Sequence, residues 1–362
     1  MRKNLFLSKV LIILVLVQLA LFVSAAGHRV FLLHPTVGNI ENMMELLQQK
    51  VIDIPNLEMV GVYHEKEVSD YDKSASYLKE KKIAHYTLMK ISGELTTKNI
   101  FGENPCSPAF RKIVQEADAI LFFGGPDIQP SIYGESQHLL TVVTDPYRHL
   151  METSLLFHLM GGSRNPDFKP LLLQKPGMIV RGFCLGMQTM NVAAGGTLIQ
   201  DIPQQVYNVS TAEGMLAIDA KNRHHNYQNE LNPGCELDWG MLHPIRFAST
   251  GYLQELGKKM DQQQPLVFSS HHQAAGKLGK NLEVIATSMD GKIVEGLQHK
   301  IFREVIGVQF HPEKSSLYFP DALYVSTPGQ KISLNKQLVA EKSMDFHLKF
   351  WKDFSAKVAA IK

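Results

Sequence analysis

The segment that most constrains the fold is GMIVRGFCLGMQTMNVAAGG, residues 177–196. An apolar strand pattern leads directly into Gly-x-Cys-x-Gly, and a helix pattern follows at once. Gly182 and Gly186 permit a sharp turn, so the segment predicts a nucleophile elbow that holds Cys184 on a strained bend. The helix N-terminus favours a thiolate there, because its free N–H groups are positively polarised. A buried thiol in a glycine-rich turn is the competing interpretation.

Strand and helix patterns alternate through the first half of the chain, which predicts an α/β fold with a mainly parallel central sheet flanked by helices. The second half contains short strands separated by turn residues, which predicts an antiparallel extension, with a hairpin at Asp290–Gly291. A helix is expected to close the chain over 335–360, and no linker divides 27–362, so one domain is expected. The expected strands are 28–35, 57–64, 83–91, 117–124, 242–248, 266–273, 282–291, 293–300 and 305–313, and the other expected helices are 40–50, 109–117 and 145–161.

A second motif, GVQFHPE at residues 307–313, combines a base with a carboxylate. His311 follows an apolar strand, so it is expected at the carboxyl end of that strand, where open α/β sheets carry their sites. Glu313 is close enough in sequence to orient the imidazole. A cysteine, a histidine and an acid are the parts of a catalytic triad. The alternative for this motif alone is a surface turn with a capping carboxylate.

A third motif, FFGGPD at residues 122–127, is suited to an oxyanion hole. A strand that ends in two glycines leaves backbone N–H groups free at a bend. Pro126 has no N–H, so the donor is Gly125 or Gly124, and the amide of Leu185 is expected to be the second donor. An ordinary tight turn is the alternative.

These motifs together resemble the class I glutamine amidotransferase-like superfamily. The resemblance rests on GFCLGMQTMNVAAGGTLIQDI, SSHHQ, GVQFHPE and FFGGPDIQPSIYG, which cover 117–313 in the family's order. Within the superfamily, the chain is most similar to the γ-glutamyl-γ-aminobutyrate hydrolase and γ-glutamyl hydrolase peptidases. Residues before Ala117 match only as a generic α/β start.

The resemblance implies a flavodoxin-like sheet and hydrolysis of γ-glutamyl amides through a thioester on Cys184, with no cofactor and a small-molecule γ-glutamyl substrate. A glutaminase or amidotransferase subunit, and a non-catalytic amino-acid or peptide binding protein, remain as alternatives. The residues that it implies are a triad of Cys184, His311 and Glu313, an oxyanion hole from Gly125 and Leu185, and substrate contacts from Gln188, His272 and Gln273.

The chain departs from the family pattern in three places. Gly124, Gly125 and Pro126 stand where the family often has three glycines. Two segments, near 205–266 and 315–336, are longer than the usual connections, and both adjoin motif residues in sequence. These insertions are expected to form a lid or rim, and they leave the substrate open but not the chemistry.

Four histidines in the second half of the chain are candidate metal ligands. They are His224, His225, His243 and His271. No carboxylate or cysteine lies at ligand spacing beside them, so no metal site is predicted. A structural polar pair is the alternative for His271 and His272.

Residues 1–26 have the pattern of a secretory signal peptide. Arg2, Lys3 and Lys9 precede an apolar run at 10–23, and small residues follow. The run is shorter than a membrane-spanning helix requires, so export to the periplasm or the cell exterior is expected, with no stable membrane span after processing. An uncleaved membrane anchor is the alternative.

The chain has 3 cysteines, too few for a disulfide framework in 362 residues. A bridge between Cys106 and Cys235 would leave Cys184 free, and two unrelated buried thiols are the alternative. The net charge is only +2, and no basic run marks a nucleic-acid footprint, so nucleic acid is not expected as a partner. The oligomeric state is not indicated by the sequence.

Overall fold

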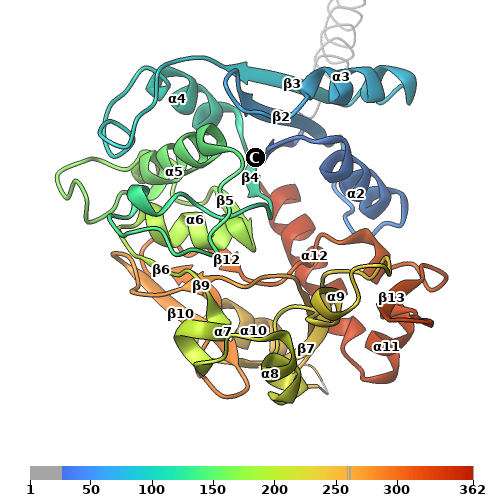
Figure 1. The fold of residues 1–362 in the computed structure, drawn as a ribbon. Helices are drawn as coiled ribbons and strands as arrows, with labels where there is room; N and C mark the ends of the chain where they lie inside the picture. Colours follow the sequence, from blue (N-terminus) through green and yellow to red (C-terminus); the bar gives the residue numbers. More distant parts are fainter. Residues whose placement is uncertain (1–26, 259, 261, 362) are drawn as a thin grey trace, which may run out of the picture.

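A ten-stranded sheet organises the part of the chain that the computed structural model describes, which is residues 27–258, 260 and 262–361 (Figure 1). Its first strands are mutually parallel, and the remaining four are antiparallel. The α/β prediction with an antiparallel extension is therefore confirmed. In spatial order the strands are β3 (Tyr86–Ile91), β2 (Glu58–His64), β1 (Arg29–Leu33), β4 (Ala119–Phe122), β5 (Ile179–Phe183), β12 (Val305–Val308), β11 (Val294–His299), β10 (Leu282–Ser288), β7 (Met241–Phe247) and β8 (Leu266–Ser269).

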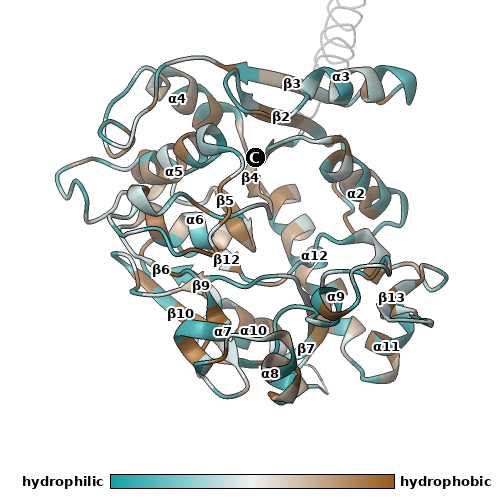
Figure 2. Ribbon diagram, viewed as in Figure 1, coloured by the Kyte–Doolittle hydropathy of each residue, from teal (hydrophilic) through white to brown (hydrophobic). Residues whose placement is uncertain are grey.

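The sheet is buried on both faces, as its continuous apolar strands require. In β1, Phe31 and Leu33 contribute to one core and Val30 and Leu32 to the other, because successive side chains point to opposite faces. Figure 2 shows mainly hydrophobic colouring around β5 and β12, and much hydrophilic colouring on peripheral helices. The first core is covered by α4 (Ser107–Glu116), α5 (Pro146–Met160) and α6 (Leu185–Ala193), and the second by α2 (Val37–Gln48) and α12 (Met344–Ala359).

The helix predicted over 145–161 is α5, and its ends follow local chemistry. The Asp145 side chain accepts a hydrogen bond from the Arg148 amide, and Pro146 occupies the first turn. At the other end Gly161 has a φ of 72°, a conformation that favours glycine. These caps fix where α5 begins and ends, and so place its inward-facing side chains.

Two helical predictions need correction. The final helix is divided into α11 (Leu334–Ala340) and α12, because Lys342 adopts a φ of 53° between them. An additional helix, α3 (Tyr71–Glu80), lies between β2 and β3, where Asp70 caps its first turn. The predicted hairpin is present, since β10 and β11 pair antiparallel around Asp290–Gly291.

The first predicted insertion contributes both to the sheet and to the surface. Its later part contains β7 and α10 (Tyr252–Gly257), and β7 pairs with β10 in the main sheet. Its earlier part contains four short helical elements, of which α7 begins just before the insertion. These are α7 (Ile202–Tyr207), α8 (Ala212–Ala217), η3 (Ala220–Asn222) and α9 (Gln228–Leu231).

The second predicted insertion packs against the first. It forms η4 (Ser315–Leu317) and a hairpin of β13 (Tyr324–Thr327) and β14 (Gln330–Ile332). The Asp238 amide donates to the Val325 carbonyl at 2.9 Å, and the Val325 amide donates to Asp238 Oδ2 at 2.8 Å. This reciprocal pair joins two segments that are distant in sequence.

Of the two possibilities left open for Cys106 and Cys235, the structure contradicts the bridge. Both are free thiols, and Cys106 is buried while Cys235 is exposed. The predicted signal peptide lies outside the described residues. Within the described residues, no helix has the length and apolar character needed to cross a membrane.

Candidate active site

Cys184 occupies the turn between β5 and α6 in a strained conformation. Its φ of 49° and ψ of −105° are unusual for a residue with a side chain. A Cβ on Gly182 would lie 2.7 Å from backbone atoms of Gly186, and a Cβ on Gly186 would lie 2.4 Å from the Phe122 carbonyl oxygen. Both glycines are therefore required by close backbone packing, as the elbow pattern predicts.

His311 lies beside Cys184 because β5 and β12 are parallel neighbours. Phe183 and Val308 are partners in register, so the residues that follow both strands emerge at the same edge. Nδ1 of His311 lies 2.7 Å from Oε1 of Glu313, and the ring is also hydrogen-bonded to Cys184. The three residues predicted as a triad are thus brought together.

The charge state of His311 follows from its neighbours. Burial alone lowers the pKa of this imidazole, but the charges of Glu313 and Cys184, with the hydrogen bonds to both, outweigh it and raise the pKa to about 10. An imidazolium at neutral pH stabilises a thiolate next to it. The arrangement is therefore able to supply a nucleophile and an acid at the same place.

The turn that carries Glu313 is held by two donors on one carbonyl. The Tyr318 hydroxyl and the Trp351 indole N–H both donate to the Pro312 carbonyl, at 2.8 and 2.9 Å. Trp351 belongs to α12 and is fully buried. The orientation of the acid is thus coupled to the packing of the C-terminal helix.

The Gly-Gly turn after β4 completes the same edge of the sheet. A Cβ on Gly124 would lie 2.6 Å from Cε1 of His311, and one on Gly125 would lie 2.9 Å from Cδ2 of Leu185. The two predicted oxyanion donors, Gly125 and Leu185, are therefore neighbours beside Cys184.

Arg148 on α5 stabilises this turn by hydrogen bonds to its carbonyls. Its role was not predicted from the sequence. Its Nη2 donates to the carbonyls of Phe123 and Gly124, each at 3.0 Å, and its Nε pairs with Glu152 at 2.7 Å. The i, i+4 spacing of Arg148 and Glu152 is the only local signal, and it is also common on exposed helices. Here both side chains are buried.

Two of the predicted substrate residues are occupied with each other. Gln188 lies one turn beyond Cys184, and its amide donates to the Gln273 carbonyl at 3.1 Å. The Gln273 side chain is buried and donates to the Gln200 carbonyl at 3.1 Å. Gln188 therefore holds the segment after β8 against α6, and Gln273 joins the same segment to Gln200.

His272, the third predicted substrate residue, is held between two carboxylates. Its Nε2 lies 3.1 Å from Asp127, and its Nδ1 lies 3.3 Å from Asp201. Burial lowers the pKa of His272, but the hydrogen bonds and charges of Asp127 and Asp201 raise it to about 9. His272 therefore joins the Gly-Gly-Pro-Asp turn to the start of α7. Sequence reasoning did not identify either carboxylate.

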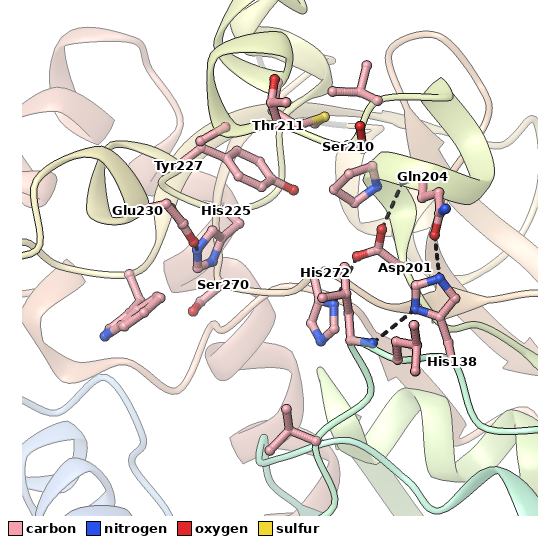
Figure 3. A pocket seen from close by; sticks show the side chains of 18 of the residues that line it. His138, Asp201, Gln204, Ser210, Thr211, His225, Tyr227, Glu230, Ser270 and His272 are labelled. Atoms are coloured by element: carbon pink, nitrogen blue, oxygen red, sulfur yellow. Dashed lines mark hydrogen bonds and ion pairs between the residues drawn. The ribbon is translucent and has the colours of Figure 1, made fainter.

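A pocket of about 980 Å³ lies between the first insertion and the segment 137–142 (Figure 3). His225, Tyr227 and His272 are among its lining residues, and Leu139, Leu140 and Trp239 add exposed apolar surface. A smaller hollow of about 330 Å³ is lined by Gly124, His311 and Glu313. Trp239 and Ser270 line both, so the two spaces adjoin.

The histidine group is completed by a carboxylate that the sequence analysis did not include. His224, His243 and His271 gather around Glu295 of β11, which comes from much later in the chain. His225 lies apart from them, 3.1 Å from Glu230. The expectation that no carboxylate accompanies these histidines is therefore wrong.

A parallel sheet whose adjacent strands end in Gly-Gly, Cys and His defines a class I glutamine amidotransferase-like protein. The model of the Peptidase C26 family matches residues 58–313. The chain belongs to this family, and the membership indicates a hydrolase or amidotransferase type of function.

Curated relatives agree with this class. A "putative glutamine amidotransferase-like protein" of Lactococcus lactis is 28% identical over 54% of this chain, and a "putative glutamine amidotransferase" of Mycobacterium tuberculosis is 31% identical over 56%. Another protein with the former description, from Rickettsia prowazekii, is 26% identical over 64% of this chain and 80% of its own length. The matches cover 66% and 53% of the first two relatives.

Proposed function

We propose that the protein is a cysteine hydrolase that cleaves γ-glutamyl amide bonds. The observation that carries this proposal is the convergence of Cys184, His311 and Glu313 at one edge of the sheet. The strained φ of Cys184 adds support, because backbone strain is typical of elbow nucleophiles.

The proposed reaction begins when the Cys184 sulfur attacks the γ-carbonyl carbon of the substrate. The tetrahedral oxyanion accepts hydrogen bonds from the amides of Gly125 and Leu185. His311 gives its proton to the departing amine as the C–N bond breaks, which leaves a γ-glutamyl thioester. His311 then takes a proton from water, the hydroxyl oxygen attacks the thioester carbonyl, and the C–S bond breaks to release glutamate and restore the Cys184 thiolate beside protonated His311. Glu313 keeps the imidazole oriented.

The two adjoining spaces support a division of the substrate between them. The smaller hollow contains Asn39, Asn42 and Lys314 beside His311, which suits the charged and polar groups of a glutamyl unit. The larger pocket presents apolar side chains with carboxylates at its edge, which suits an amine on an apolar body. The insertions therefore select the leaving amine in this proposal. Of the three predicted substrate residues, His272 lines the larger pocket, whereas Gln188 and Gln273 are buried and support the segment that carries it.

The experiment that tests this function is a panel of γ-glutamyl compounds with different amines, assayed by glutamate release. Cys184→Ala is the blank, and Cys184→Ser is expected to lose about 10³-fold or more in kcat/KM while it keeps the wild-type melting temperature. Near-wild-type turnover by Cys184→Ser would overturn the assignment.

Two other functions remain distinguishable. A glutaminase subunit, favoured by the amidotransferase names of the relatives, would prefer free glutamine and release ammonia. A binding protein would bind γ-glutamyl compounds but release no glutamate. Measurement of ammonia, glutamate and binding heat on the same panel separates the three.

Export remains part of the proposal, and its support is the sequence pattern of residues 1–26. N-terminal sequencing of protein recovered from a secreting host tests it. A mature chain that begins near residue 26 or 27 is expected, and an intact N-terminus in a membrane fraction would favour the anchor.

A further inference from the structure

A buried group of three imidazoles and one carboxylate lies apart from Cys184. One potential ligand atom from each of its members lies within 4.8 Å of all the others. Their solvent-exposed fractions are between 0 and 4%. The members are His224 after η3, His243 on β7, His271 after β8 and Glu295 on β11.

Most polar atoms of this group have no hydrogen-bond partner. Neither nitrogen of His224 and neither oxygen of Glu295 is hydrogen-bonded, and Nε2 of His271 is also unpaired. Nδ1 of His224 lies 3.0 Å from Oε1 of Glu295, and even when this contact is counted as an ion pair, Nε2 of His224 and Oε2 of Glu295 have no partner. A buried carboxylate without hydrogen bonds is strongly unfavourable unless a cation compensates it.

The surroundings of two histidines resemble those of metal ligands. Nδ1 of His271 lies 2.8 Å from the Gln273 carbonyl, so Nδ1–H donates and Nε2 keeps its lone pair. His243 contacts the Pro244 carbonyl through Nδ1 at 3.2 Å and the Ser269 hydroxyl through Nε2 at 2.8 Å, so it would bind an ion through one of these nitrogens in place of that contact and keep the other contact. Histidines that bind metals are usually oriented by a second hydrogen bond of this kind.

We propose that His224, His243, His271 and Glu295 bind one Zn²⁺ ion in a structural site. Imidazole and carboxylate ligands suit Zn²⁺, and four protein ligands fill a tetrahedral shell without an open position for water. Metal–ligand bonds of about 2.0–2.1 Å place the ligand atoms of a tetrahedral site about 3.3 Å apart. Small side-chain rotations therefore bring these four ligand atoms to the distances that the site requires.

The site joins parts of the chain that form the pocket wall. It links the segment after η3, in the first insertion, to β7, β11 and the end of β8. His271 is followed directly by His272, which lines the large pocket. The backbone amide of Gln309, which shortly precedes His311 in the chain, donates to the Glu295 carbonyl. The metal therefore fixes the wall relative to the sheet and takes no part in the hydrolytic step.

A second cluster shows why the first is distinctive. His34, Glu67 and Asp145 also lie close together, but each has partners within the protein. The Tyr71 hydroxyl contacts both His34 and Glu67, and Asp145 accepts hydrogen bonds from backbone amides. This cluster is satisfied without an ion.

The test begins with metal analysis of the full-length protein produced in medium supplemented with zinc. Plasma mass spectrometry is expected to find about one zinc per chain, and a strong chelator is expected to lower the melting temperature until Zn²⁺ is returned. Co²⁺ in place of Zn²⁺ is expected to give the intense visible bands of a tetrahedral site. The proposal would be overturned if the purified protein contained no metal and its melting temperature did not change when Zn²⁺ was added. That result would indicate a histidine–carboxylate network without a metal.

Matched variants locate the ion. His224→Asn and Glu295→Gln are expected to lose most of the bound zinc, whereas His225→Asn, at the adjacent position outside the group, keeps it. Cys184→Ala is also expected to keep it, and loss of zinc in that variant would move the ion to the active site and overturn the assignment. If the ligand variants do not fold, the Co²⁺ spectrum and the zinc-dependent melting of the wild-type protein still decide the question. None of these outcomes depends on the hydrolase activity.

Discussion

Cys184 donates its backbone N–H to the carbonyl of Val308, 2.9 Å away, so the elbow is fixed to the strand that leads to His311. The proposed nucleophile and its proposed base are therefore positioned by backbone pairing and not by side chains alone. Side-chain substitutions that preserve this backbone pairing are expected to alter catalysis without altering the fold.

Glu313→Gln is expected to lower kcat about 10²–10⁴-fold, because the neutral amide no longer supports the imidazolium of His311. The pKa of His311, raised to about 10 in the wild type, should fall in the variant. Inactivation by iodoacetamide should then be rapid at pH 6–7 in the wild type but should rise steeply with pH in the variant. Equal pH profiles for the two proteins would contradict the role assigned to Glu313.

Gly124→Ala is expected to reduce turnover by about 10²-fold, since its Cβ would lie 2.6 Å from Cε1 of His311 and displace the ring. The matched control is Gly177→Ala, whose Cβ meets nothing within 4 Å. Kinetics and melting curves of both variants check this. A Gly124→Ala enzyme as active as the control would show that the turn does not confine His311.

The His272 ion pairs make stability depend on pH. Because the folded-state pKa is raised from 6.5 to about 9, the stabilisation is complete below pH 6.5 and is lost as pH rises to about 9. The free energy of unfolding of His272→Gln should therefore be lower than that of the wild type at pH 6, by about 1 kcal/mol for this partly exposed group, and the difference should shrink as the pH rises through 9. A gap that does not vary with pH would exclude the imidazolium.

The three thiols are expected to differ in reactivity. Burial raises the pKa of Cys106 to about 11, so this thiol should be inert at pH 7, whereas Cys235 is exposed and therefore accessible to the reagent. Labelling of the unreduced protein should modify Cys184 and Cys235 in the native state, and all three after unfolding. A missing thiol after unfolding would indicate a disulfide and contradict the structure.

Trp239→Ala is expected to raise KM for substrates with bulky apolar amines by about 10-fold and to leave kcat nearly unchanged. Trp239 lines both adjoining spaces and is 60% exposed, so its loss should not unfold the protein. The control substrate carries a small amine, for which KM should hardly change. Equal effects on both substrates would place the amine elsewhere.

Local patterns predicted the parts of the site that lie at strand ends. Cys184, His311 and Gly125 each follow an apolar strand, and parallel strands bring their carboxyl ends to one edge. Sequence reasoning grouped β12 with the later short strands, yet it lies between β5 and β11 and is parallel to β5. That position depends on long-range pairing, which periodicity does not reveal.

The missed residues are those whose role arises only from tertiary contacts. Asp127 and Asp201 are unremarkable in sequence, and they meet through His272. Glu295 sits within a buried strand, where a carboxylate is unexpected, and that was the available signal. The break at Lys342 was also missed, because a single left-handed residue leaves little trace in an otherwise helical pattern.

The reciprocal hydrogen bonds between Asp238 and Val325 have a consequence for how such a protein diversifies. The two surface segments support each other, yet neither supplies Cys184, His311 or Glu313. A change of length or composition in one segment is therefore expected to require a matching change in the other, and to leave the proposed catalytic residues in place. Under the proposed function, substrate preference is expected to depend on both segments together, and exchange of one segment alone between relatives is expected to give a well-folded core with a poorly defined entrance.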